Sequence, residues 1–175
     1  MKWLAIALGV IAAVIALYLV IDYLVVTDEE VIEDLFDKAV EAIEKEDITS
    51  LLGFVAEDFK YEAKGVNKRR LEMLALQTFR EVDNVSFETS EKSIEVQGDE
   101  ATIRISFRIL GEYVGRMEQF VGERGFILGK PLKAARATLH LRRQPPVGNE
   151  KPTWLLYRLT EFDPGFAMPT GRGSK

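Results

Sequence analysis

The sequence predicts an α+β domain, with helices on one face of an antiparallel sheet, behind an N-terminal transmembrane helix. Three observations support this prediction. Residues 3–21 carry no charge, residues 28–82 have apolar residues at helical spacing, and from Val85 onward apolar and polar residues alternate. Helices followed by strands are typical of α+β proteins. We therefore expect a transmembrane anchor over 1–26, one domain over 27–163 and a disordered tail over 164–175.

The first segment is long enough to cross a bilayer. An α-helix of residues 3–21 is about 28 Å long, which matches the ~30 Å hydrocarbon core. Trp3, Tyr18 and Tyr23 flank the apolar run at depths that suit aromatic rings. A cleaved signal peptide is the alternative, but it needs a shorter apolar core and small residues at the cleavage site. The large residues that follow the run favour an uncleaved anchor.

The charges beside this segment predict its orientation. Lys2 precedes the apolar run, whereas Asp22 and Asp28 follow it, and the next cation is Lys38. Cytoplasmic flanks carry the excess of Lys and Arg in membrane proteins. We therefore expect a cytoplasmic N-terminus and a domain outside the membrane.

Capping residues mark the starts of three helices. Thr27 and Glu30 form a capping box, Asp47 is the N-cap of a second helix, and Asn67 is the N-cap of a third. Each start precedes an apolar stripe at helical spacing. The expected stripes are Val31, Ile32, Leu35, Phe36, Ala39, Val40 and Ile43 in the first helix; Leu51, Leu52, Val55 and Phe59 in the second; and Leu71, Leu74, Thr78, Phe79 and Val82 in the third.

Strands follow from Val85 onward, where the apolar period changes to two. Residues 101–109 alternate strictly and predict a half-buried strand after a turn at Gly98 and Asp99. Residues 135–142 alternate in the same way. Residues 153–162 are apolar on both sides, which predicts a central strand.

This order of elements resembles the nuclear transport factor 2-like (NTF2-like) and SnoaL-like (polyketide cyclase-like) domains. The resemblance rests on residues 41–62, where a first helix ends at Asp47, a short helix follows, and Asp58, Phe59 and Tyr61 lead into a strand. It implies a cone-shaped domain of three helices on a curved antiparallel sheet. It also implies a pocket between sheet and helices, and dimers formed through the outer sheet face.

The residue inventory excludes several kinds of chemistry. The chain has no cysteine and one histidine, His140, so thiol chemistry and Cys- or His-based metal cages are excluded, and no metal or cofactor is expected. His140 lies on the polar side of its strand, so we expect a solvated surface histidine. Tyr157 and Glu161 share a strand face with Leu155 and Leu159, which would direct them inward as acid and base. A buried tyrosine beside a rim glutamate is the alternative.

Charge is distributed unevenly along the chain. Residues 28–99 contain 9 Lys and Arg against 20 Asp and Glu, whereas residues 100–175 contain 13 against 7. Alternation directs four arginines away from the core side of the sheet, where they would bind an acidic partner or pair with neighbouring glutamates. These arginines are Arg104, Arg108, Arg136 and Arg142.

A second basic cluster lies in the first turn of the third helix. Lys68, Arg69 and Arg70 occupy positions where the helix dipole disfavours cations by about 0.3 to 1 kcal/mol each. Pairing with Glu62 and Glu72 would offset this cost. The other interpretation is an anionic ligand or the membrane surface.

Together these features predict a membrane-anchored, non-catalytic binding or assembly module of the cell envelope. Its basic sheet face would contact a second copy or an acidic protein, and a small pocket would take an apolar ligand. Nucleic acid is not an expected partner, because an acidic domain repels it. The alternative function is a pocket enzyme, an isomerase, cyclase or hydrolase of a small apolar molecule, with Tyr157 and Glu161 as its catalytic pair.

Overall fold

The first helix begins at its predicted capping box. The computed structural model describes residues 27–114, 124–145 and 153–165. Helix α2 (Asp28–Glu44) starts where the Thr27 amide donates to the Glu30 carboxylate at 2.9 Å and the Glu30 amide donates to the Thr27 hydroxyl at 3.3 Å.

The predicted transmembrane anchor lies outside the described residues. Among those that are described, the helices are all too short or too polar to cross a bilayer.

Helices α3 (Ile48–Gly53) and α4 (Lys68–Glu81) also begin at their predicted caps. Asp47 accepts from the Ser50 amide at 3.0 Å, and Asn67 accepts from the Arg70 amide at 2.9 Å. The second stripe was predicted to continue through Val55 and Phe59, and this is wrong. The chain leaves the helix after Gly53, so both residues belong to strand β1 (Val55–Tyr61).

A single curled sheet contains all the described strands. Besides β1 these are β2 (Val66–Asn67), β3 (Val82–Gln97), β4 (Glu100–Tyr113), β5 (Arg124–Leu128), β6 (Ala135–Gln144) and β7 (Thr153–Asp163), with a 3-10 turn η1 (Glu62–Lys64) between β1 and β2. The strand order is β2-β1-β7-β6-β4-β3, and β5 pairs with the second half of β4. The last strand is central, as predicted.

The predicted antiparallel sheet is in fact mixed. β1 runs parallel to β7, while the other neighbouring strands pair antiparallel. β1 lies between two helices in the sequence, so the chain reaches the sheet edge beside β7 from the helical layer. The fold is therefore α+β, with three helices in the concave side of a mixed half-barrel.

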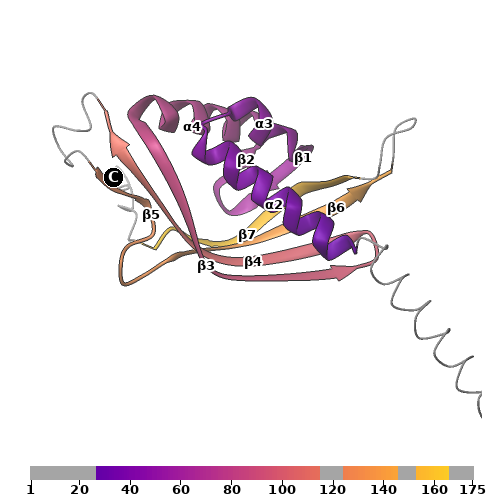
Figure 1. The fold of residues 1–175 in the computed structure, drawn as a ribbon. Helices are drawn as coiled ribbons and strands as arrows, with labels where there is room; N and C mark the ends of the chain where they lie inside the picture. The colour runs from indigo at the N-terminus through magenta and orange to yellow at the C-terminus, as the bar shows by residue number, and fades with distance from the viewer. Residues whose placement is uncertain (1–26, 115–123, 146–152, 166–175) are drawn as a thin grey trace, which may run out of the picture.

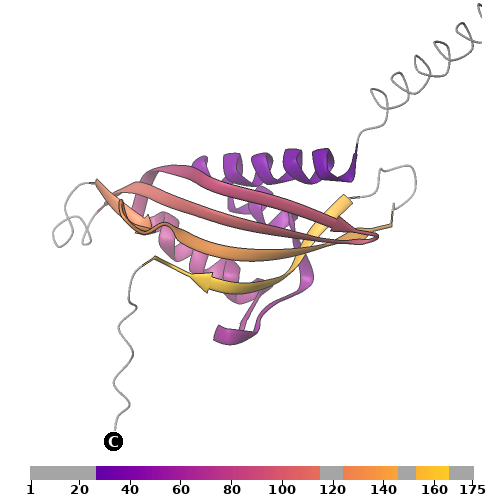
Figure 2. The ribbon, with the colours of Figure 1, turned by 90° about the horizontal axis from the view of Figure 1, so that it is seen from below.

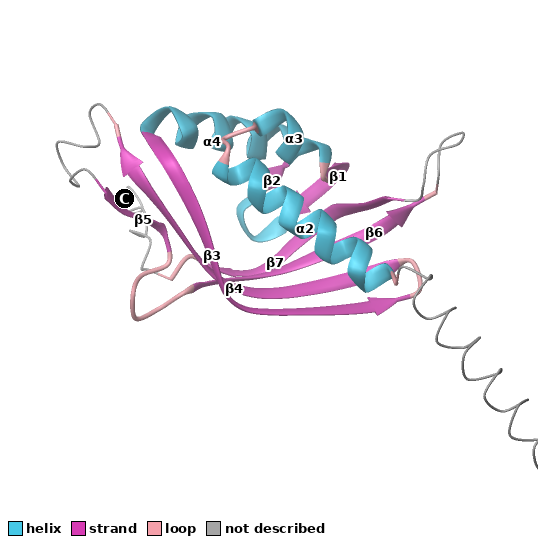
Figure 3. Ribbon diagram, in the orientation of Figure 1, coloured by secondary structure: helices cyan, strands magenta, loops and turns pink. Residues whose placement is uncertain are grey.

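The helices α2, α3 and α4 lie on one face of the sheet (Figures 1 and 3). Viewed from below, the opposite face of β4, β6 and β7 carries no helix from the described part of the chain (Figure 2). We call this opposite side the outer face. It is the side on which Thr102, Arg104 and Ser106 of β4 pair with His140, Thr138 and Arg136 of β6.

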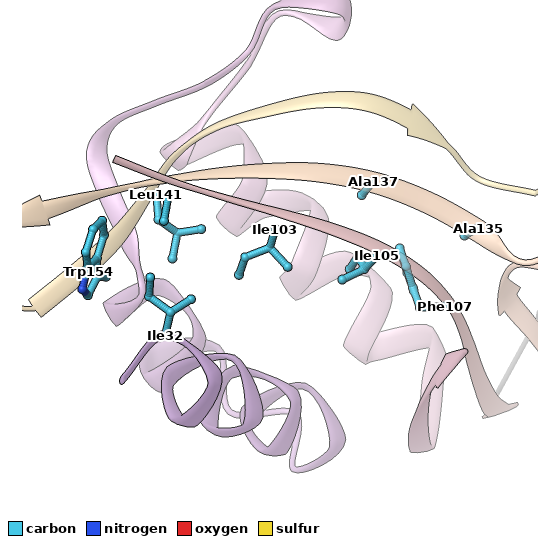
Figure 4. Close-up of a cluster of buried hydrophobic side chains, with 9 residues drawn as sticks. Ile32, Ile103, Ile105, Phe107, Ala135, Ala137, Leu141 and Trp154 are labelled. Carbon is cyan, nitrogen blue, oxygen red and sulfur yellow. The ribbon is translucent and has the colours of Figure 1, made fainter. Parts of the chain in front are cut away.

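The core lies between α2 and the inner face of β4, β6 and β7 (Figure 4). Ile32 of α2 is fully buried against Ile103 and Leu141, and Trp154 closes one end of the cluster. Ion pairs fasten α2 at its edges. Lys92 of β3 pairs with Glu33 at 2.8 Å, and Arg143 of β6 pairs with Asp28.

Candidate functional site

An apolar pocket of about 590 Å³ lies between α4 and the sheet. Side chains of nine elements line it, including Phe59 and Tyr61 of β1, Leu71 and Phe79 of α4, Ile127 of β5 and Phe162 of β7. The apolar stripe of α4 is thus directed at this pocket. No residue of α4 is fully buried, and Leu74 remains 47% exposed although it lines the pocket.

Few polar groups reach this pocket. The Thr78 hydroxyl donates to the carbonyl of Leu74 at 2.9 Å and is thereby satisfied within the helix. Lys64 and Arg70 are the cations of the lining, and the residues that line the described pocket include no Asp, Glu or His. Proton transfer to and from a bound substrate usually needs such a group within hydrogen-bond reach.

Tyr157 and Glu161 do not line this pocket, and their predicted inward orientation is wrong. β7 has an extra residue opposite β6 at two places, because His140 and Leu141 pair with Arg158 and Leu156, while Arg136 and Thr138 pair with Asp163 and Thr160. Such bulges reverse the inside and outside alternation of a strand. Tyr157 and Glu161 are the residues at these bulges, and Glu161 has a φ of 49°.

Both side chains consequently lie on the outer face. The Thr138 hydroxyl donates to the Glu161 carboxylate at 2.7 Å, and the Tyr157 ring lies 5.6 Å from the Arg142 guanidinium carbon. The Tyr157 ring and the Glu161 carboxylate contact different partners. The two residues therefore do not form an acid–base pair around a shared cavity. No signal in the sequence marks these bulges, since neither carries a glycine.

The four predicted arginines lie on the outer face, and three of them have partners. Arg104 pairs with Glu95 at 2.6 Å, and Arg142 binds both carboxylate oxygens of Asp58 at 2.9 and 2.6 Å. That bidentate contact holds the pKa of Asp58 below its ordinary value. Arg108 donates to the carbonyls of Lys130 and Pro131. Arg136 is exposed and makes no ion pair with any described residue.

A groove of about 560 Å³ runs across this outer face. Arg104 and Arg136 line it together with Glu91 and Glu161, so one depression holds both cations and anions. Ser106 donates to Glu91 at 3.1 Å within the groove. The outer face is therefore not uniformly basic. β3 contributes glutamates to it, and β3 belongs to the acidic part of the chain, residues 28–99.

The basic cluster of α4 is divided between three environments. Lys68 pairs with Glu57 at 2.6 Å and donates to the Val55 carbonyl at 2.8 Å, so it fastens α4 to β1. Its predicted partners, Glu62 and Glu72, are not the ones it uses. Arg69 is exposed to solvent, while Arg70 lines the apolar pocket.

His140 is half-buried on the outer face, whereas a solvated histidine was predicted. Its Nε2 lies 2.9 Å from the Thr160 hydroxyl, and its Nδ1 lies 3.4 Å from the Thr102 hydroxyl. Burial lowers the pKa of His140 below its ordinary value, and the nearby charge of Arg158 lowers the pKa further. The ring therefore bridges β4 and β7 in its neutral form.

Acidification is expected to destabilise the wild-type chain more than the His140→Gln variant. Because the folded pKa is lowered, the unfolded chain binds a proton at this site more readily, and folding stability falls as the pH drops below about 6.5. Urea unfolding at about pH 7.5 and about pH 5.5 measures the loss of folding stability in the wild type and in the variant. Equal losses in the two chains would mean that another group titrates in this window.

The geometry is that of known α+β half-barrels. No protein-family model matches the sequence, and no curated protein sequence is significantly similar to it. Solved structures do match. An NTF2-like superfamily protein from Salmonella enterica superposes with a TM-score of 0.57 at 12% identity, over 82% of this chain and 94% of that one.

Two further structures support the same assignment. A ketosteroid isomerase-like protein from Erwinia carotovora matches with a TM-score of 0.53 at 19% identity, over 76% of this chain and 95% of that one. An NTF2-like protein with a cystatin-like fold from Novosphingobium aromaticivorans matches with a TM-score of 0.55 at 20% identity, over 85% and 84% of the two chains. The chain therefore has the NTF2-like fold.

Proposed function

We propose that this protein is a membrane-anchored binding or assembly module of the cell envelope, without catalytic activity. Residues 1–26 would anchor it with the N-terminus in the cytoplasm and the domain outside. The outer face would make its protein contact, and the interior pocket would hold an apolar ligand. The observation that carries this proposal is the mixed-charge groove on a sheet face that no described helix covers.

A second copy of the chain is the partner that the groove fits best. Two copies related by a twofold axis present the same patch to each other, so the patch must complement itself. A groove that holds Arg104 and Arg136 beside Glu91 and Glu161 meets this requirement, because each copy offers both signs of charge. Arg136 also lacks an ion-pair partner among the described residues and would gain one in the dimer. An acidic protein is the second candidate partner, since it would use the same arginines.

Reversing the charge of Arg136 is expected to weaken self-association at least tenfold, which corresponds to about 1.4 kcal/mol. The Arg136→Glu variant would place three carboxylates in the groove and remove one of the cations that would face the partner's carboxylates. Sedimentation equilibrium of the full-length chain in detergent measures the dimer constant. Crosslinking in membranes, followed by mass spectrometry, identifies any acidic partner that is lost with the same variant.

Arg80→Glu is the matched control. Arg80 is an exposed arginine in the last turn of α4, on the helical side of the molecule, and it does not line the groove. The control should keep the wild-type dimer constant. If Arg136→Glu and the double variant Arg104→Glu/Arg136→Glu both keep the wild-type oligomeric state and crosslinked partners, the outer face is not an interface.

The enzyme alternative receives less support. The pocket has a volume that suits a small molecule. However, the Tyr157 and Glu161 pair on which that alternative depends lies outside it, and its described lining offers no carboxylate or imidazole. An isomerase, cyclase or hydrolase would have to work with Tyr61, Lys64 and Arg70. A binding role does not require these residues to transfer protons.

A further inference from the structure

The apolar pocket follows α4 over most of the helix, and the lining residues at the two ends of this stretch differ in chemistry. Residues of α4 line it from Arg70 to Phe79, a helix length of about 13 Å. At one end, Lys64 of η1 and Arg70 of α4 contribute cationic groups. Phe79 marks the other end, and the lining there and on the sheet side, such as Ile127 of β5 and Val85 of β3, offers only hydrocarbon surface.

The two cations have no counter-ion among the described residues. Neither Lys64 nor Arg70 forms an ion pair with a described residue, although the neighbouring Lys68 is paired with Glu57. Both side chains are exposed, so their charged groups remain in water while their stems border the apolar lining. The described lining contains no acid that would repel an anion.

The apolar face of α4 is also incompletely covered. The apolar residues on one side of α4 line the pocket and do not pack against another layer of the protein. No residue of α4 is fully buried. An apolar stripe normally packs against another surface, because exposure of apolar area to water is unfavourable. A bound hydrocarbon chain would supply the surface that the sheet does not.

We propose that the ligand of this pocket is a single-chain amphiphile with a terminal carboxylate. Its hydrocarbon chain lies along α4 toward Phe79, and its carboxylate lies at the Lys64 and Arg70 end. This inference rests on the pocket of the proposed function and adds the charge and shape of the ligand to it. A volume of about 590 Å³ accommodates one such chain.

Photoaffinity labelling of the full-length chain tests this inference. The protein is placed in nanodiscs of zwitterionic phosphatidylcholine and exposed to a diazirine-bearing decanoate or to the matched decanol probe. Mass spectrometry then maps the labelled peptides. The decanoate probe is expected to label peptides of α4 and β7 at about fivefold lower concentration than the decanol probe, the gain that exposed charge pairs give. Lengthening the carboxylate by one methylene should lower the required concentration by up to about fourfold.

A matched pair of variants separates the two cations of the pocket from another cation at the start of α4. Lys64→Gln/Arg70→Gln should remove the preference for decanoate and leave labelling by decanol unchanged. Arg69→Gln also removes a charge in the first turn of α4, but Arg69 does not line the pocket. That variant should keep the full preference. Circular dichroism of each variant checks that the fold is retained.

The possible results distinguish this inference from the proposed function. If both probes label α4 and β7 equally in the wild type, the pocket binds apolar molecules without reading a carboxylate, and only the further inference is wrong. If Arg69→Gln lowers the preference as much as the double variant, general surface charge explains it, and the inference is also wrong. If neither probe labels these peptides, the pocket does not bind such a molecule, and the ligand role in the proposed function is wrong too.

Discussion

Replacing Ile32 with alanine is expected to lower the free energy of unfolding by about 2 to 5 kcal/mol. The Ile32 side chain is fully buried between α2 and the sheet, where it contacts the cluster around Ile103 and Trp154 (Figure 4). Truncation removes its buried methyl and methylene groups and leaves a cavity that the surrounding strands cannot readily fill. Alanine has the higher helix propensity, so the loss cannot come from the helix itself. Urea unfolding followed by circular dichroism measures it.

Leu132→Ala provides the matched control for this substitution. It also shortens an aliphatic side chain to alanine, but Leu132 is fully exposed in the turn between β5 and β6. Surface substitutions of this kind usually change stability by no more than about 0.5 kcal/mol. A small effect of Ile32→Ala, similar to that of Leu132→Ala, would show that α2 is not packed on the sheet through Ile32.

Gly129→Ala is expected to destabilise the fold by on the order of 1 to 3 kcal/mol from backbone strain alone. Gly129 has a φ of 76°, which an L-residue with a side chain rarely adopts. An added Cβ would also lie 3.1 Å from the Ala135 amide nitrogen and 3.1 Å from the Phe107 carbonyl oxygen. These are backbone atoms of adjoining strands, so they cannot move aside as a flexible side chain would.

Gly53→Ala is the same chemical change at an unconstrained position. Gly53 ends α3, has no positive φ, and an added Cβ there meets no atom within 4 Å. Reduced entropy of the unfolded chain should make this variant neutral or up to about 1 kcal/mol more stable. Thermal unfolding of the two variants side by side gives the comparison. Equal stability of both would contradict the tight turn at Gly129, where the amide also donates to the Pro164 carbonyl at 2.9 Å.

The helix starts and the two faces of β4 were predictable because their causes are local. Each N-cap side chain reaches an amide three residues away, as Thr27, Asp47 and Asn67 do. Strict alternation likewise assigns Ile103 to the core and Arg104 to the outer face without knowledge of the partner strands. Such patterns need only a few neighbouring residues, so the sequence by itself determines them.

The candidate site depends on contacts between residues far apart in the sequence. Arg142 reaches Asp58 across 84 residues, and this contact exists because β1 returns beside β7 in parallel. The bulges of β7 likewise depend on its register with β6, and they turn Tyr157 and Glu161 to the outer face. In the sequence, Arg70 is one of three cations at the start of a helix. Only the tertiary structure places it in the lining of the pocket.

The sequence alone therefore determined where α2, α3 and α4 begin, which apolar residues of β4 face the core, and that the fold is α+β. The tertiary structure decided which side chains share a cavity or a groove. The physical reason is that periodicity and capping act over a turn or two, whereas strand register and helix docking depend on the packing of the whole domain. One extra residue opposite β6 is enough to move a candidate catalytic glutamate from the inner face to the outer face.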